Sequence, residues 1–272
     1  MYYNFRGIDV HYEHQRTGSK YTLVLIHGLG GYSGDWSRLT EAFSDEQSFL
    51  IPDLPGCGKS SFVDDPWFFS FEGLSELLLE LIEEIKVNNP VLCGYSAGGR
   101  LVFYMAANEM LKNKGFVSIS STPGLPTDEL RAERAAEDIE HAAKIMEFGI
   151  DAWVDNWLNL ELFDGLKTLP ETFYKQYDTR KRLNSAKILK NYLLNSGLGV
   201  MPFLQDKLRS VKQSGLLITG GNDKKYEGIA QRVCGLNKRF EHIVIPESWH
   251  TVYMEKPVET AKAIKAFLTK IE

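Results

Sequence analysis

The fold of this chain is decided by the stretch Val91-Leu92-Cys93-Gly94-Tyr95-Ser96-Ala97-Gly98-Gly99-Arg100. Its apolar start, residues 91–93, is typical of a buried strand, and residues 94–98 match the pattern G-x-S-x-G. The apolar segment 101–107 follows and predicts a buried helix. A strand, a tight turn and a helix form the context in which this pattern presents a reactive serine. The sequence therefore predicts a nucleophile at Ser96, flanked by the small residues that a strained turn requires.

Short apolar runs alternate with amphipathic segments on both sides of this stretch. Besides an opening hairpin over residues 2–13, we predict strands at 22–26, 49–52, 116–120, 215–219 and 241–245. We predict helices at 35–43, 70–85, 226–234 and 257–271. Such alternation predicts an α/β fold with a mostly parallel, eight-stranded sheet flanked by helices.

Residues 127–205 interrupt this alternation, because they carry helical patterns and no convincing strand. Helices are expected there at 128–148, 151–157, 171–176 and 185–194. We interpret residues 122–205 as an all-helical cap that is inserted after the sixth strand. Residues 1–121 and 206–272 then form the core, whose carboxyl strand ends are the expected place for a ligand.

Composition narrows the class of protein. The net charge of −5 argues against general nucleic-acid binding. The sequence has no run of about 18 apolar residues, so we expect no membrane span. The first seven residues lack the features of a signal peptide. Three cysteines without metal-ligand spacing fit a reducing cytoplasm. We expect a cytoplasmic monomer or small homo-oligomer that needs no metal and no organic cofactor.

A serine hydroxyl needs an adjacent imidazole before it reacts. Three histidines follow Ser96 in the chain. His141 falls inside a predicted cap helix and His242 inside a predicted strand, whereas His250 lies in the loop after the last strand. This placement favours His250 as the base, the alternative being a loop histidine without a partner.

The acid that orients this imidazole should follow the preceding strand, where Asp223 stands. Asp223 could instead cap the next helix. Asp178, in the cap, and Asp206, at the end of the cap, are poorer candidates. The backbone N–H groups of Ala97 and Leu29 are the candidates for an oxyanion hole.

Two neighbouring motifs receive a structural interpretation. We expect His27, which precedes the oxyanion loop, to brace that loop without reacting. Residues 53–60 end like the phosphate-binding pattern G-x-x-x-x-G-K-[ST]. Asp53 replaces its first glycine and Pro66 interrupts the helix that should follow, so a turn is the better interpretation.

With these features in place, the chain resembles the α/β-hydrolase superfamily from about residue 22 to residue 257. Within it, the chain is most similar to the family of 2-succinyl-6-hydroxy-2,4-cyclohexadiene-1-carboxylate synthases of menaquinone biosynthesis. The similarity lies in residues 94–100, 121–125, 132–134, 155–157, 162–163, 182–184 and 221–226. Trp249 and Tyr253 depart from the family, which often has glycine and histidine at these positions.

The resemblance implies a lyase that eliminates pyruvate from 2-succinyl-5-enolpyruvyl-6-hydroxy-3-cyclohexene-1-carboxylate by proton abstraction, assisted by Ser96, His250 and Asp223. The implied partner is this small substrate with three carboxylates. The substrate-binding residues implied are Tyr95, Arg100, Arg134, Trp157, Phe163 and Arg182. Two alternatives stay open: a serine hydrolase of small esters or amides on the same triad, and a non-enzymatic receptor or regulator. Arg134, Trp157 and Arg182 could also be ordinary cap residues.

Overall fold

The computed structural model describes residues 1–110 and 114–271. Its centre is an eight-stranded sheet with the order β1-β2-β4-β3-β5-β6-β7-β8. The two pairings that involve β2 are antiparallel and all others are parallel, so the predicted sheet is confirmed. The strands are β1 (Tyr2–Phe5), β2 (Ile8–Gln15), β3 (Thr22–Ile26), β4 (Ser48–Pro52), β5 (Pro90–Tyr95), β6 (Gly115–Ile119), β7 (Ser214–Gly220) and β8 (Phe240–Ile245).

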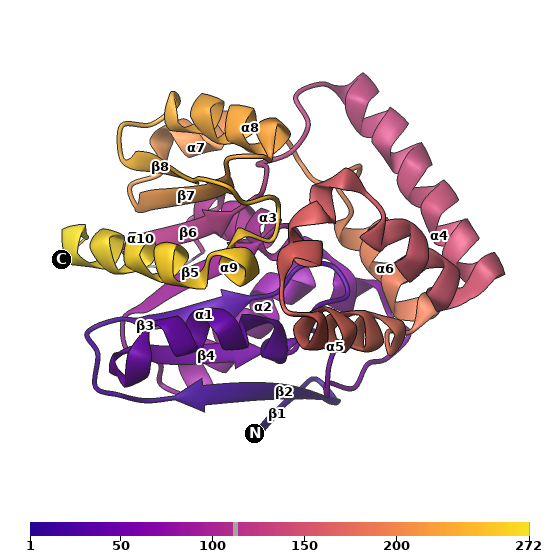
Figure 1. Cartoon of the computed structure of the whole chain (residues 1–272), viewed down its shortest axis with the longest axis horizontal. Coiled ribbons are helices and arrows are strands. Elements are labelled where there is room, and N and C mark those ends of the chain that lie inside the picture. Colours follow the sequence, from indigo (N-terminus) through magenta and orange to yellow (C-terminus); the bar gives the residue numbers. More distant parts are fainter. Residues whose placement is uncertain (111–113, 272) are drawn as a thin grey trace.

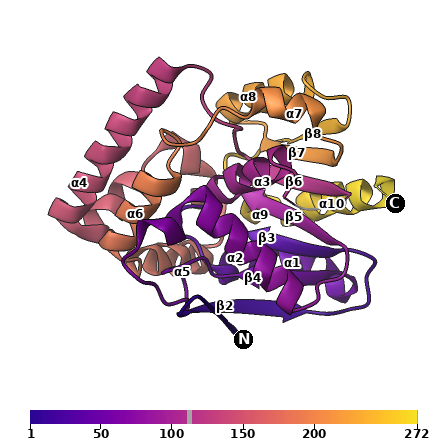
Figure 2. The same cartoon turned by 180° about the vertical axis from the view of Figure 1, so that it is seen from behind.

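Helices cover both faces of the sheet (Figures 1 and 2). One face carries α1 (Ser37–Ala42), α9 (Val252–Glu255) and α10 (Pro257–Lys270). The other face carries α2 (Phe71–Glu84), α3 (Ala97–Ala107), α7 (Gln205–Ser210) and α8 (Lys224–Cys234). Within the described ranges, no helix is both long and apolar enough to cross a membrane.

The side chains of β3 show why the sheet needs both layers. All five residues of this strand are buried. Val24 and Ile26 pack with α2 and α3, whereas Leu23 and Leu25 pack with α1 and α10. Successive side chains of a strand point to opposite faces, so a strand that is covered on both sides has no solvent-exposed position. This is the physical reason for the uninterrupted apolar run in the sequence.

The connection from β6 to β7 contains helices and no strand, and all of these helices except α7 stand beside the sheet in Figure 1. They are α4 (Asp128–Leu158), the 3-10 helix η4 (Glu161–Thr168), α5 (Glu171–Arg182), α6 (Ala186–Ser196) and α7. The two helices predicted over 128–157 form one element that is interrupted at Gly149, whose φ is 82°. Helix α5 also runs six residues beyond its predicted end at residue 176. The cap boundaries at 122 and 205 stay a prediction.

Short 3-10 turns complete the core. They are η1 (Ser33–Trp36), η2 (Ser44–Glu46) and η3 (Pro66–Phe69). The helix that we predicted over 35–43 is therefore divided into η1 and α1, and Asp35 lies inside η1 instead of capping α1.

The close contact between α3 and β3 generates a first prediction. A Cβ atom at Gly98 would lie 2.2 Å from the carbonyl oxygen of Ile26, which is backbone and cannot move aside alone. We expect Gly98→Ala to lower the free energy of unfolding by about 2–3 kcal/mol, as overpacking does. Urea denaturation measures this.

Gly228→Ala is the matched control, because its Cβ would have no neighbour nearer than 3.6 Å inside α8. We expect this change to be neutral or stabilising by up to about 1 kcal/mol through helix propensity. Equal unfolding free energies for the two variants would contradict the close-packing argument.

Candidate active site

Ser96 lies at a sharp turn between β5 and α3. Its φ of 50° and ψ of −107° are strained for a residue with a side chain. The backbone is held on both sides, because the N–H of Ser96 donates to the Ile119 carbonyl at 2.9 Å and its carbonyl accepts from Ser121 Oγ at 2.7 Å. The strained turn therefore places the Ser96 hydroxyl at the carboxyl edge of the sheet, as the sequence pattern predicts.

The structure brings Ser96, His250 and Asp223 together from the ends of three strands. His250 Nε2 lies 3.1 Å from Ser96 Oγ, and His250 Nδ1 lies 2.7 Å from Asp223 Oδ2. Both His250 and Asp223 are buried. Asp223 also accepts from the N–H of Tyr226 at 3.4 Å, so the same carboxylate orients the imidazole and caps α8. This geometry suits proton transfer from Ser96 to His250.

The loop that carries His250 is braced by a residue that sequence reasoning missed. The Glu255 carboxylate accepts from the N–H of Trp249 at 2.6 Å, from the N–H of Thr251 at 3.0 Å and from Thr251 Oγ1 at 2.6 Å. These bonds fix the backbone on both sides of His250. Burial raises the pKa of Glu255, and the three hydrogen bonds oppose that rise. No sequence motif marks Glu255, because its role arises only once the loop folds back on α9.

The two other candidate histidines are excluded by their surroundings. His141 is exposed on α4. His242 lies within β8, where its Nε2 is 2.8 Å from Thr219 Oγ1. Neither residue approaches Ser96, which leaves His250 as the imidazole at this serine.

His27 holds the loop that follows β3. The N–H of Leu54 donates to His27 Nε2 at 3.1 Å, so Nδ1 carries the proton and donates to the Gly28 carbonyl at 2.9 Å. Burial lowers the pKa of His27 to about 4. His27 is therefore a neutral brace at pH 7 and has no contact with the reactive serine.

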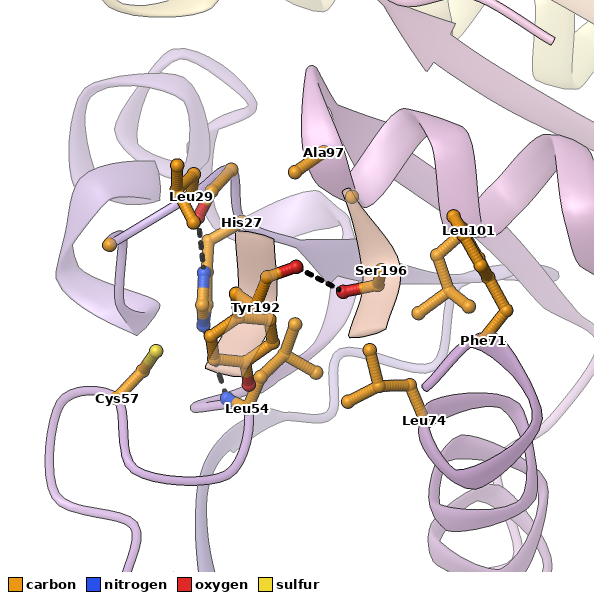
Figure 3. A pocket seen from close by; sticks show the side chains of 13 residues that line it. His27, Leu29, Leu54, Cys57, Phe71, Leu74, Ala97, Leu101, Tyr192 and Ser196 are labelled. Carbon is orange, nitrogen blue, oxygen red and sulfur yellow. Dashed lines mark hydrogen bonds between the residues drawn. The ribbon is translucent and has the colours of Figure 1, made fainter. Parts of the chain in front are cut away.

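Leu29 and Ala97, the two candidate oxyanion donors, line one small cavity. It has a volume of about 20 Å³ and a mostly apolar wall (Figure 3). The wall includes Leu54, Leu74 and Leu101. The two residues come from different loops, after β3 and after β5, and meet here beside the start of α3.

Arg100 lies one helical turn beyond Ser96 and is half-buried. In the described part of the chain, its guanidinium has no hydrogen bond and no ion pair. Burial lowers its pKa to about 10, with Arg134 also lowering it and Tyr226 raising it. Arg134 is paired with Asp138 at 2.8 Å on α4. An unpaired guanidinium at such a position is suited to bind an anion.

An aromatic row leads from the cap to the triad. Trp153 stacks on Trp157 with ring centroids 5.0 Å apart, and Trp157 lies 5.0 Å from Phe163. Phe163 meets the His250 ring edge-on at 5.9 Å. Tyr95 packs against the other side of His250 at 5.3 Å. Two of the predicted aromatic residues, Tyr95 and Phe163, thus contact the imidazole, and both are buried, whereas Trp157 reaches it only through Phe163.

One of the two residues that depart from the family pattern packs against the site residues. Tyr253 is buried, 4.4 Å from Trp36 and 4.9 Å from Tyr95 by ring centroids. It supports the residues behind the triad. The sequence predicts no role for Tyr226. In the structure its ring tilts against His250, with ring centroids 4.6 Å apart. Burial raises the pKa of Tyr226, whereas the nearby charges of Arg100 and Arg134 act to lower it.

Arg182 does not join this group. Its three guanidinium nitrogens donate to Asp178, Asp151 and Asp155, all within the cap. No donor is left for a substrate carboxylate, so the prediction of Arg182 as a ligand fails and we omit it from the site. The preceding residue, Lys181, is the buried cation of this segment.

The segment that resembles a phosphate loop is a turn around Asp53. The buried Asp53 carboxylate accepts from the N–H groups of Ser33 at 2.5 Å and Lys59 at 2.9 Å, and lies 2.8 Å from His11 Nδ1. These donors point at the protein's own carboxylate and not at a phosphate site. Among the described residues, no group of three His, Cys, Asp or Glu side chains is placed to hold a metal ion.

The fold agrees with comparisons with known proteins. A model described as the alpha/beta hydrolase family matches residues 23–263. The chain belongs to the α/β-hydrolase family. Among solved structures, this α/β-hydrolase is similar to MenH from S. aureus, with a TM-score of 0.90 and 26% identity over 96% of this chain and 98% of that one. An enol-lactonase from Burkholderia xenovorans LB400, at 18% identity and a TM-score of 0.82, shares the fold.

The chain is also similar in sequence to named proteins. The α/β-hydrolase is 32% identical over 251 residues to a provisionally assigned 2-succinyl-6-hydroxy-2,4-cyclohexadiene-1-carboxylate synthase of Bacillus subtilis (strain 168), covering 92% of this chain and 90% of that protein. A synthase of the same name from Escherichia coli O17:K52:H18 is 28% identical, covering 90% and 93%. Protein PHYLLO of Arabidopsis thaliana is 29% identical over 91% of this chain, which spans 15% of PHYLLO's length.

The neutral state of His27 generates a second prediction. Its pKa rises from about 4 in the folded protein to an ordinary 6.5 on unfolding, so its contribution to stability is present above pH 6.5 and is lost as the pH falls toward 4. Between pH 7 and pH 5 this loss is about 2 kcal/mol. His27→Gln keeps an amide donor and acceptor but cannot titrate. Urea unfolding at both pH values should show the wild type losing about 2 kcal/mol more than the variant.

Comparing the wild type with the His27→Gln variant cancels the contribution of every other titrating group to the pH dependence. Asp35, whose pKa burial raises to about 6, acts in the opposite direction but is present in both. Identical pH dependence in wild type and variant would show that His27 does not titrate on unfolding.

Proposed function

We propose that the protein is a lyase that eliminates pyruvate from 2-succinyl-5-enolpyruvyl-6-hydroxy-3-cyclohexene-1-carboxylate, a step of menaquinone biosynthesis. The observation that carries this proposal is the half-buried guanidinium of Arg100, one turn from Ser96, which has no hydrogen-bond or ion-pair partner among residues 1–110 and 114–271. A cation kept without a partner beside the reactive hydroxyl favours a substrate that brings its own carboxylate. The relatives named as synthases of this reaction support the same conclusion.

In the proposed reaction, Ser96 acts as a base and forms no acyl-enzyme. His250 takes the Ser96 proton across their 3.1 Å contact, and the serine oxygen removes the proton α to the succinyl ketone. The electron pair first moves to the ketone oxygen, which the N–H groups of Leu29 and Ala97 stabilise. It then returns through the ring double bond and expels the enolpyruvyl oxygen. The leaving group takes up a proton and becomes pyruvate.

The remaining residues of the proposed site bind and enclose the substrate. Arg100 takes one carboxylate, and Arg134, whose Asp138 partner leaves part of its guanidinium exposed, takes a second. Trp157 and Phe163 form the apolar wall beside the ring of the substrate. Enclosure by aromatic side chains lowers the local dielectric and strengthens each of these charge pairs.

A second candidate function is hydrolysis of small esters or amides on the same triad. The apolar cavity beside Leu29 and Ala97 favours it, since an apolar space next to the two proposed oxyanion donors can take a small acyl group (Figure 3). The cavity volume of about 20 Å³ admits about one water molecule, which limits such a substrate to the smallest acyl groups. For this reason the lyase activity is the primary proposal.

The test is a comparison of two substrates on one preparation, with Ser96→Ala as the blank. We expect pyruvate release from the enolpyruvyl precursor, and weak hydrolysis of p-nitrophenyl acetate without a burst. A site that holds cations for carboxylates penalises an uncharged ester, because the cations would be left unpaired as water is excluded. Ester hydrolysis above about 10⁴ M⁻¹s⁻¹ in kcat/KM, with no pyruvate released, would favour the hydrolase instead.

Arg100 provides a sharper test of the substrate charge. We expect Arg100→Ala to lower kcat/KM for the precursor by about 2–4 kcal/mol, or roughly 30-fold to 1000-fold, as loss of a partner from a desolvated charge pair does. Arg100→Lys should recover little, because an ammonium cannot form the bidentate fork. Arg209→Ala, on the exposed end of α7, is the matched control and should match the wild type. If Arg100→Ala also matched it, Arg100 would not bind the substrate.

A further inference from the structure

A buried lysine of the cap contacts the backbone of the oxyanion loop. Lys181 comes from the end of α5 and is 4% exposed. Its Nζ donates to the carbonyl of Leu29 at 3.2 Å and to the carbonyl of Gly30 at 2.9 Å. Asn184, just after α5, also donates to the Gly30 carbonyl at 2.9 Å. Two side chains of the cap therefore bind the loop that supplies one oxyanion donor.

A buried carboxylate compensates the lysine charge from the core side. Asp35 Oδ2 lies 4.0 Å from Lys181 Nζ and accepts from the N–H of Tyr32 at 3.4 Å. Burial raises the pKa of Asp35 to about 6, and Lys181 is the strongest influence that lowers it. Arg180 also lowers it, and Asp53 raises it. The Lys181–Asp35 pair therefore connects α5 of the cap to η1, the 3-10 turn that follows the oxyanion loop.

Hydrogen bonds to the carbonyl groups of Gly28 and Leu29 fix the orientation of the Leu29 N–H. In a trans peptide the N–H points opposite to the preceding carbonyl. The Gly28 carbonyl, which precedes Leu29, accepts from His27 Nδ1 at 2.9 Å and from the N–H of Gly31 at 3.0 Å. The Leu29 carbonyl, on the other side of the same residue, is held by Lys181. One peptide plane that flanks Leu29 is thus held from the core and the other from the cap.

We propose that Lys181 is a positioning residue of the oxyanion hole, which fixes the peptide plane that follows Leu29 and thereby keeps the Leu29 N–H in its donating orientation. The inference extends the proposed role of the Ser96 site, but it does not depend on which substrate that site takes. Lys181 contacts no reacting atom and acts only through the backbone of the loop.

Two effects of removing Lys181 have to be separated. The first is a loss of stability, because an ionised Asp35 would stay buried without its cation. The second is a slower reaction at Ser96, because a donor that is displaced by about 1 Å costs roughly 100-fold in rate. Lys181→Met combined with Asp35→Asn removes both charges, so it should restore stability without restoring the position of the Leu29 N–H.

The experiment measures Ser96 reactivity with ethyl p-nitrophenyl methylphosphonate, together with urea unfolding. In this reaction Ser96 Oγ bonds to phosphorus, p-nitrophenolate leaves, and His250 receives the serine proton, while the phosphoryl oxygen occupies the hole. We expect the double variant to unfold like the wild type but to react about 10-fold to 100-fold more slowly. In the lyase assay its kcat should fall by a similar factor with KM within about twofold.

Lys175→Met is the matched control, because Lys175 is exposed on the same helix and pairs only with Glu171 among the described residues. It should react at the wild-type rate. A double variant that is stable and reacts at the wild-type rate would overturn the proposal, and so would rate losses that only follow losses of stability. A wild type that reacts with the phosphonate but releases no pyruvate would reject the lyase function and leave this test of Lys181 intact.

Discussion

The site depends on how closely three backbone segments approach each other around Ser96. Added Cβ atoms at Gly94 and Gly98 would lie 2.3 Å and 2.2 Å from backbone carbonyl oxygens. Only glycine fits at such distances, and only this packing keeps the serine at a φ of 50° with its hydroxyl at the sheet edge. The turn fixes the Ala97 N–H and the position of Arg100, which lie within one helical turn of Ser96, and it places the Ser96 hydroxyl 3.1 Å from His250.

Much of this arrangement could be predicted from the sequence because the evidence is local. An apolar strand, a G-x-S-x-G turn and a following helix are contiguous, and parallel sheets need uninterrupted apolar strands. Asp223 and His250 could be predicted because each directly follows a strand, and strand ends meet at one edge of the sheet. Their predicted meeting is confirmed by the distances to Ser96 and to each other.

The cap was harder to predict, because its side chains take their roles from distant partners. Three consecutive cations, Arg180, Lys181 and Arg182, look equivalent in the sequence. In the structure one lies over the Tyr32 ring, one is buried against loop carbonyls and one is enclosed by aspartates. Helical periodicity indicates which residues share a face but not what that face meets. Glu255 is a similar case, since its partners are backbone N–H groups that leave no pattern in the sequence.

The interruption of α4 at Gly149 divides the proposed binding residues between two segments of the helix. Arg134 belongs to the first segment, which packs on α6, and Trp157 belongs to the second, which packs with Phe163 beside the triad. An added Cβ at Gly149 would have no neighbour within 4 Å, so its positive φ and not crowding requires glycine there. Charge and aromatic lining are therefore carried on two segments of one helix, on either side of Gly149. A residue at this position that disfavours positive φ would change the angle between the segments, and with it the spacing between the charged and the aromatic side of the proposed site.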